Sequence, residues 1–163
     1  MKSAAGFLRI IAGDLDDPRV VALLERHLRH CRADTPPESV HALDFSGLRA
    51  PDVSFWTAWE GDGVVGTGAL KRLAADHGEI KTMHTAAEAR GRGVGRVMLK
   101  HIVAAARERG LARLSLETGA REDFKPAHAL YRSHGFVDCP PFGDYAPDPH
   151  SYFLTLDLRG PQA

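Results

Sequence analysis

The chain has 163 residues, of which 44% are hydrophobic and 26% charged, as expected for one domain with a buried core. Its 21 Lys and Arg residues balance 21 Asp and Glu residues, so no overall field attracts nucleic acid or an anionic membrane. The sequence shows neither a run of roughly 20 apolar residues nor a signal-peptide core. We therefore expect a single domain over residues 1–163, a cytoplasmic address, and no nucleic-acid or membrane partner.

The first fifty residues predict a strand, a helix and an irregular segment. Residues 7–11 favour a strand, and apolar residues spaced three and four apart over 19–32 predict a helix that follows Asp17-Pro18. A pair of prolines then interrupts the chain. Residues 40–50 are predicted to form a short helix or an irregular loop.

Three potential metal ligands, His27, His30 and Cys31, lie close together on the predicted helix. A structural zinc site needs four ligands, and no second cluster in the sequence supplies the others. Partly buried helix side chains account for these residues without a metal, so we expect none. Cys31 and Cys139 are also too few for a disulfide framework.

The next part of the chain predicts an antiparallel meander. Residues 53–60 and 64–72 alternate in hydrophobicity on either side of Gly61-Asp62-Gly63, which indicates a hairpin. A third strand is predicted over residues 79–85, after a short link. Consecutive strands joined by short turns pair with their neighbours.

A turn rich in glycine and arginine follows the third strand, over residues 90–96, and apolar spacing predicts a helix from Val94 to Gly110. Glycines at a helix N-terminus let backbone N–H groups approach an anion, and arginines add positive charge. The spacing matches neither a P-loop nor a dinucleotide-binding fingerprint. A tight turn with solvated arginines is the plainer alternative; otherwise the pattern indicates a phosphate-bearing ligand.

The last third predicts a strand over residues 111–118, a short helix over 126–134 and strands over 136–139 and 151–158. The strand, helix and strand from residue 79 onward imply a right-handed crossover and a parallel strand pair. The connection over 140–150 contains four prolines, so we expect a stiff loop.

Two motifs resemble those of the GNAT superfamily, the acyl-CoA-dependent N-acyltransferases. Arg90-x-x-Gly93-x-Gly95 resembles that family's pyrophosphate loop, and residues 127–136 resemble its A-x-x-L-Y-x-x-x-G-F segment. The resemblance covers about residues 55–158. It implies an α/β (α+β) fold with a mixed central sheet, antiparallel N-terminal strands, a splayed parallel central pair, and helices on both faces.

The resemblance also implies an activity, namely transfer of acetyl from acetyl-CoA directly to an amine in a ternary complex, without a metal. Tyr131 is then the proton donor to the thiolate, and Glu79 is the first candidate for the base, with Glu117 and His84 as rivals. The residues expected to contact acetyl-CoA are Met83, His84, Thr85, Arg90, Gly91, Arg92, Gly93, Val94, Gly95 and Arg96. One position departs from the family, because Phe124 stands where an asparagine often contacts the cofactor.

The acceptor is predicted to be a small-molecule amine or a peptide amine. Phe45, Glu117, Asp144 and Tyr145 are the candidate acceptor contacts, and the alternative for the loop residues is ordinary packing or solvated surface. A homodimer is expected because symmetric dimers are common. Two other functions stay open: a non-catalytic acetyl-CoA sensor or interaction module, and a protein or peptide N-acetyltransferase.

Overall fold

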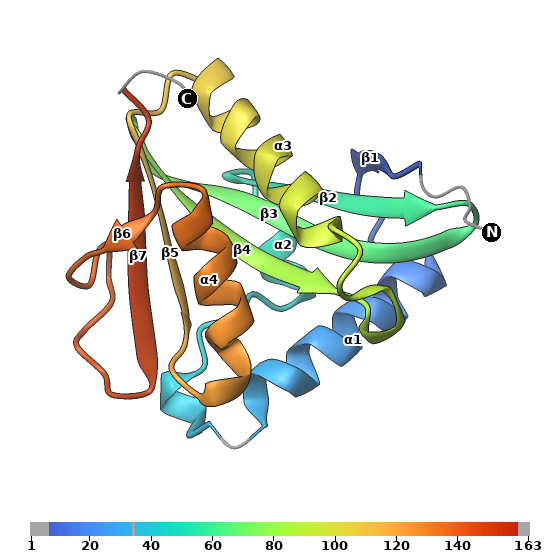
Figure 1. Cartoon of the computed structure of the whole chain (residues 1–163), viewed down its shortest axis with the longest axis horizontal. Coiled ribbons are helices and arrows are strands. Elements are labelled where there is room, and N and C mark those ends of the chain that lie inside the picture. The colour runs from blue at the N-terminus through green and yellow to red at the C-terminus, as the bar shows by residue number, and fades with distance from the viewer. Residues whose placement is uncertain (1–6, 34, 160–163) are drawn as a thin grey trace.

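The computed structural model describes residues 7–33 and 35–159, which form a sheet flanked by helices (Figure 1). The strands are β1 (Arg9–Ala12), β2 (Val53–Glu60), β3 (Gly63–Ala74), β4 (His77–Thr85), β5 (Arg113–Gly119), β6 (Val137–Asp138) and β7 (Ser151–Asp157). The α-helices are α1 (Pro18–Arg32), α2 (Phe45–Leu48), α3 (Val94–Glu108) and α4 (Lys125–Ser133). Short 3-10 turns lie at Pro37–Ser39, Ala87–Ala89 and Glu122–Phe124.

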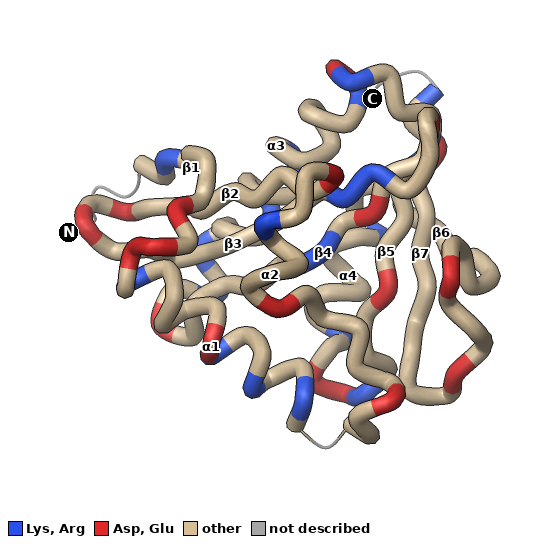
Figure 2. The backbone as a smooth tube through the Cα atoms, turned by 180° about the vertical axis from the view of Figure 1, so that it is seen from behind, with Lys and Arg blue, Asp and Glu red and all other residues tan. Residues whose placement is uncertain are grey.

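The sheet has the order β1-β2-β3-β4-β5-β7-β6, and every neighbouring pair is antiparallel except the parallel pair β4–β5. Helices α3 and α4 cover one face, and α1 and α2 cover the other (Figures 1 and 2). This arrangement confirms the predicted mixed fold, including the crossover from β4 through α3 to β5. Figure 2 also shows Lys and Arg positions interspersed with Asp and Glu positions along the backbone.

Several predicted boundaries were wrong at the ends of strands. The first strand is Arg9–Ala12 and not 7–11, and β4 begins at His77, two residues earlier than predicted. Its early start follows from pairing, because His77 and Gly78 lie opposite Arg113 and Leu114 of β5. Strand β6 is shorter than predicted, since two prolines that lack backbone donors follow Cys139.

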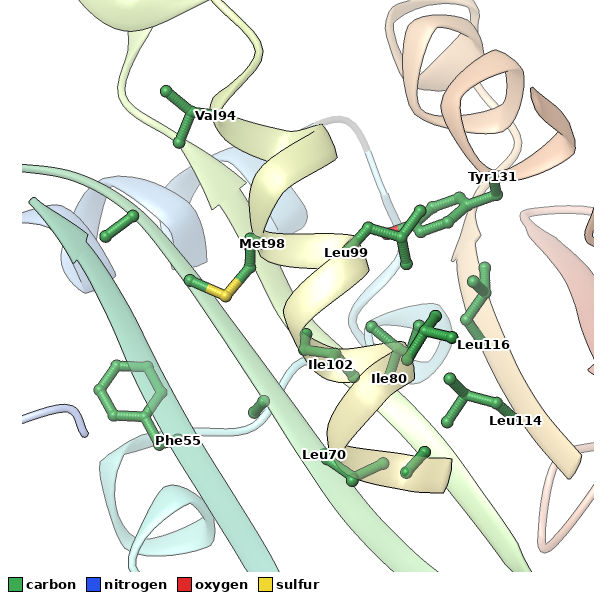
Figure 3. Close-up of a cluster of buried hydrophobic side chains, with 14 of the residues drawn as sticks. Phe55, Leu70, Ile80, Val94, Met98, Leu99, Ile102, Leu114, Leu116 and Tyr131 are labelled. Carbon is green, nitrogen blue, oxygen red and sulfur yellow. The ribbon is translucent and has the colours of Figure 1, made fainter. Parts of the chain in front are cut away.

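Helix α3 supplies much of the core on its face of the sheet (Figure 3). Met98, Leu99 and Ile102 are almost fully buried against the strands, and burial of each such side chain contributes about 1.5–3 kcal/mol. The helix comes close because β3 carries glycine beneath it. A Cβ at Gly66 would lie 2.7 Å from Val94, and one at Gly68 would lie 2.7 Å from Met98.

Helix α1 packs its apolar face on the opposite side of the sheet and begins at a capped end. The Asp17 carboxylate accepts a hydrogen bond from the Arg19 N–H, and Pro18 occupies the first turn. Val20, Leu23 and Leu24 are at most 1% exposed. Across residues 7–33 and 35–159, the helices lack the combination of length and hydropathy needed to cross a bilayer.

Candidate active site

Strands β4 and β5 are paired at one end and separate at the other. Their register runs only from His77 opposite Arg113 to Ile80 opposite Leu116. Beyond that point a cleft lies between the strands, and its walls come from α1, from the segment around residues 35–42, and from α4. Its lining residues are His27, Cys31, Thr35, Ser39, Val40, His41, Ala42, Ile80, Lys81, Thr82, Met83, Leu116, Glu117, Thr118, Gly119, Phe124, Ala127, Tyr131 and His150.

Thr82, just past the paired part of β4, has an unusual backbone. Its φ is +60°, a left-handed conformation that costs a β-branched residue about 1–3 kcal/mol. The β3–β4 register shifts between Thr67 and Ala69, opposite this residue. Because the register is irregular here, the side chains of β4 do not alternate strictly between the two faces of the sheet. Lys81 and His84, an odd number of residues apart, therefore both lie on the α1 side.

Past the cleft, β4 runs on through His84 and Thr85 to the turn that precedes α3. Gly91 and Gly93 have φ values of +80° and +85°, and a Cβ at either position would meet no atom within 4 Å. Gly93 caps α3 without a side-chain hydrogen bond, so the first N–H groups of the helix stay available to an anion. This cradle has the open space and the backbone donors that a diphosphate group needs; that it binds one stays a prediction.

The other predicted cofactor residues surround the same turn. Arg90, Arg92 and Arg96 are exposed, and Arg92 pairs with Glu60 at 2.7 Å. Val94 is 3% exposed and packs into the core, so only its backbone could face a ligand. Met83 lines the cleft. Thr85 lies beside Gly95, whose Cβ position would be 3.7 Å from the Thr85 Oγ1.

Tyr131 on α4 reaches the cleft from the α3 side of the sheet, and its ring points toward Leu99 (Figure 3). The residue is 3% exposed and packs edge-on against Phe136. Burial raises the pKa of its phenol, so the hydroxyl keeps its proton at neutral pH. It has no hydrogen-bond partner within the described residues, and its proton is therefore available to a ligand.

Glu79 is buried and held by two neighbours. Its Oε2 accepts a hydrogen bond from Lys81 Nζ at 3.0 Å and another from the Tyr145 hydroxyl at 2.5 Å. Lys81 Nζ is also 3.0 Å from the Tyr145 oxygen. Glu79 lines a second depression beside the cleft, and Lys81 lines both. One oxygen of the carboxylate thus accepts both hydrogen bonds, and Glu79 does not line the main cleft.

Glu117 on β5 lies on the main cleft, where Tyr131 also lies. Burial raises the pKa of its carboxyl group, while the nearby His41 and Lys81 lower it. Lys81 Nζ is bonded to Glu79, so Glu79 and not Glu117 holds that ammonium group. A half-buried carboxylate in this position can bind a cationic amine or accept its proton.

Two segments far apart in sequence close over the acceptor side. Ser39 Oγ donates a hydrogen bond to Asp148 Oδ2 at 2.6 Å, and the His41 ring meets the Tyr145 ring edge-on at 4.9 Å. Asp148 also accepts from the His150 N–H at 2.8 Å. Asp148 therefore holds the two segments together, whereas Asp144 is exposed on the second depression.

Phe45 does not line either depression. It starts α2 and packs against the core, as the alternative for that segment predicted. The Phe124 ring lies on the cleft wall above Gly119, where a Cβ would come within 2.3 Å of it. Position 124 thus contributes an apolar surface where the family often has an amide.

The histidines near α1 are neutral and paired. His27 and His84 meet through their Nδ1 atoms at 3.3 Å, and Cys31 Sγ lies 3.7 Å from His27 Nε2. Burial lowers the pKa of His27 to about 4 and that of His84 to about 3. His84 is therefore a poor proton acceptor at neutral pH. In the part of the chain that the structure describes, no three His, Cys, Asp or Glu residues gather as metal ligands would.

Sequence reasoning missed Lys81, Thr82 and Ser39. An alternating pattern hides Thr82, because threonine is an ordinary strand residue until the irregular register is known. Lys81 gains its place only when a loop more than sixty residues away brings Tyr145 to it. The one local signal was the pair Glu79 and Lys81, two residues apart on one face of a strand.

Comparison with known proteins agrees with this geometry. The model of the Acetyltransferase (GNAT) family matches residues 19–136. The Uncharacterized N-acetyltransferase YedL of Escherichia coli (strain K12) is 51% identical over 145 residues, covering 89% of this chain and 91% of that protein. The Uncharacterized N-acetyltransferase YsnE of Bacillus subtilis (strain 168) is 48% identical over 151 residues, covering 93% and 100%.

Among solved structures, that of a proposed acyl-CoA N-acyltransferase from Klebsiella pneumoniae subsp. pneumoniae MGH 78578 superposes with a TM-score of 0.72. It is 26% identical, and the match covers 93% of this chain and 97% of that one. The family model and the relatives indicate the same family of acetyltransferases, and the shared fold agrees with it. This chain belongs to the GNAT family and is an acetyl-CoA-dependent acyltransferase.

Proposed function

We propose that the chain moves the acetyl group of acetyl-CoA directly to the amine of a small molecule, with both substrates bound at once. One observation carries this proposal: Tyr131 and Glu117 line the same cleft, and β4, which lines it too, leads directly to the turn before the uncapped N-terminus of α3. In this proposal the proton donor and the proton acceptor share one cleft, and the anion site lies next along the chain, at the end of β4.

When bound, acetyl-CoA supplies an activated thioester. The N–H groups at the start of α3 bind its diphosphate, and the arginines at residues 90, 92 and 96 add charge. The unpaired edge of β4 beyond Ile80 offers backbone donors and acceptors to the pantetheine arm. This orients the thioester toward the closed end of the cleft.

The acceptor must lose a proton, because an amine near neutral pH is mostly protonated and cannot attack. We assign the removal of this proton to Glu117, because Glu79 already accepts hydrogen bonds from Lys81 and Tyr145. As the C–N bond forms and the C–S bond breaks, the Tyr131 hydroxyl donates its proton to the departing sulfur. In this proposal Glu79 is not the base; its hydrogen bonds hold Lys81 and Tyr145 in place on the side of the cleft where the amine binds.

A small acceptor is favoured because the two closing segments are tied together over the cleft through Ser39 and Asp148. A peptide amine is the second candidate. The expected homodimer and cytoplasmic address stay predictions.

The test is titration of acetyl-CoA by calorimetry, followed by release of free CoA with a panel of small amines and peptides. Gly93→Asp places a carboxylate in the anion cradle and should weaken acetyl-CoA binding at least roughly 100-fold. Gly61→Asp is the matched control, because Gly61 also has a positive φ and open space around its Cβ position but lies in the β2–β3 turn.

Each outcome separates two functions. Binding and CoA release with small amines support the proposal, and release with peptides alone supports a peptide acetyltransferase. Binding without release across the panel indicates a sensor. Native affinity in Gly93→Asp would remove the turn from the binding site.

A further inference from the structure

Lys81 and Glu117 occupy equivalent places on the two strands that separate. The last pair that joins β4 to β5 is Ile80 opposite Leu116, so Lys81 and Glu117 are the first residues beyond it. Ile80 and Leu116 are buried in the core under α3 (Figure 3). Because side chains alternate along a strand, the next residue on each strand points to the other face, where α1 lies. A cation and a carboxylate therefore share one face of the sheet at the point where the cleft begins.

These two opposite charges do not pair with each other. Paired strands lie about 4.8 Å apart, and opposite charges at matching positions on neighbouring strands stabilise the pairing. Among the described residues, however, no ion pair joins Lys81 to Glu117. Lys81 pairs instead with Glu79, two residues before it on the same strand, at 3.0 Å. Both Lys81 and Glu117 line the cleft, so a ligand can lie between them.

The main cleft has one formally charged side chain of each sign. Among the described residues that line it, Lys81 is the one Lys or Arg, and Glu117 is the one Asp or Glu. Burial raises the pKa of the Glu117 carboxyl group and that of the Cys31 thiol, and the Lys81 ammonium lowers both. Cys31 also lines the cleft, so the charge of Lys81 acts inside it. A ligand that carries both an ammonium and a carboxylate matches this arrangement in sign.

The Lys81 ammonium group has one donor to spare. Of its three N–H bonds, one goes to Glu79 Oε2 and one to the Tyr145 hydroxyl oxygen, both at 3.0 Å. The third has no hydrogen-bond acceptor among the residues that the structure describes. The side chain is only 9% exposed, and a buried donor without an acceptor is costly. Glu79 and Tyr145 thus fix the ammonium group in place and leave one donor for a ligand.

We propose that the acceptor is an amino acid, whose amine lies against the Glu117 carboxylate and whose own carboxylate accepts a hydrogen bond from Lys81 Nζ. This inference rests on the proposed function and names the class of its acceptor. The amine loses its proton to Glu117 and takes the acetyl group, while the carboxylate of the amino acid does not change. The products are an N-acetyl amino acid and free CoA. Lys81 then distinguishes amino acids from amines that have no carboxylate nearby, including the amino termini of peptides.

The test compares amino acids with their amides, in which a neutral group of the same size replaces the carboxylate. Release of CoA is measured with both at saturating acetyl-CoA. The native chain should show a kcat/KM roughly 10- to 100-fold higher for the amino acid, the effect typical of one hydrogen bond to a charged group. The amine of the amide is less basic and more often unprotonated, so basicity alone would favour the amide.

The decisive variant is Lys81→Met, which removes the ammonium group and keeps a side chain of similar length. It should abolish the preference, because kcat/KM for the amino acid falls far more than that for the amide. This variant also leaves the buried Glu79 carboxylate without its ion pair. The double variant Glu79→Gln with Lys81→Met avoids that charge, and it should lack the preference that Glu79→Gln alone retains.

Lys71→Met is the matched control. Lys71 lies on β3 directly opposite Glu79 and lines the second depression, but it does not line the main cleft. This variant should keep the native preference. Calorimetric titration of the amino acid into the chain loaded with CoA gives a second readout. The affinity should fall roughly 10- to 100-fold in Lys81→Met and stay at the native value in Lys71→Met.

The results separate this inference from the proposed function. If the native chain releases CoA with small amines but uses amides as well as amino acids, the inference fails alone. It also fails if Lys81→Met and the double variant keep the native preference, or if Lys71→Met loses it, because the carboxylate would then lie elsewhere. If the native chain releases no CoA with any small amine, the proposed function and this inference fail together.

Discussion

The cofactor half of the molecule and its acceptor half are built on contacts of different range. We define the cofactor half as residues 77–108, apart from Glu79 and Lys81, together with α4. The acceptor half is residues 35–45 and 139–150 with Glu79, Lys81 and Glu117. In the cofactor half, one continuous segment supplies strand, turn and helix. In the acceptor half, Ser39 bonds to Asp148, 109 residues away, and Glu79 to Tyr145, 66 residues away.

This difference shows where specificity can change without loss of the common chemistry. The anion cradle depends on local backbone geometry, whereas the acceptor wall depends on two loops that meet over the sheet. Substitutions in the first half should therefore alter acetyl-CoA binding, and substitutions in the second should alter use of the amine. Three predictions sharpen or break this division.

The largest effect is expected at Glu117 in the acceptor half. Glu117→Gln should lower kcat/KM for the amine roughly 10³-fold by removing the proton acceptor, with little change in acetyl-CoA affinity. Because the pKa of Glu117 is raised, native activity should rise with pH through a range above that of an ordinary carboxyl, and the variant should lose this limb. Glu79→Gln is the paired control and should keep the limb. A reversed result in the pH profiles would make Glu79 the base.

A smaller effect is expected at Tyr131 in the cofactor half. Tyr131→Phe should lower kcat roughly 100-fold by removing the proton donor to the sulfur. This effect is smaller than that of Glu117→Gln, because a thiol with a pKa near 8.5 leaves as a thiolate more easily than an amine loses its proton. The melting temperature should change little, since the hydroxyl lacks a partner within the described residues. Steady-state kinetics with acetyl-CoA and the best amine provide the measurement, and an unchanged kcat would exclude the donor role.

The smallest effect concerns the contact between α1 and the end of β4. His27 and His84 have pKa values of about 4 and about 3 in the folded chain, against about 6.5 when unfolded. The unfolded chain thus binds more protons between these values, so stability should fall as pH drops from about 6.5 to 4, by up to about 1.4 kcal/mol per pH unit for each histidine. The free energy of unfolding, measured with urea at a series of pH values, should fall less steeply with decreasing pH in His27→Gln than in the native chain. The exposed His150→Gln is the control, and equal slopes in all three proteins would contradict this prediction.

Local pattern was enough to predict most of the fold and the cofactor half. Helical spacing located α1 and α3, glycine spacing located the tight turn before α3, and a strand on each side of α3 predicted the parallel pair. Strand ends were less accurate because pairing partners decide them, as Gly78 opposite Leu114 shows. The predicted role of Tyr131 rests on a motif, and its burial beside the cleft is consistent with that role.

The acceptor half could not be predicted to the same depth. Asp148 accepts a hydrogen bond from Ser39, and no pattern in either loop indicates that contact. Likewise, Glu79 was chosen by its place on a strand, while its engagement by Lys81 and Tyr145 depends on tertiary structure. Contacts between residues so far apart are fixed by the whole fold.

The short pairing of β4 with β5 also has a mechanical consequence. Four residue pairs join a blade of four strands, β1 to β4, to a blade of three strands, β5, β7 and β6. Elsewhere β5 and β7 are matched over seven pairs. The joint between the blades is therefore a short one in the middle of the sheet, and a change in the angle between the blades costs less than bending either blade at β2–β3, β3–β4 or β5–β7. A ligand that bridges the two open edges would stiffen the sheet by holding the two blades at a fixed angle.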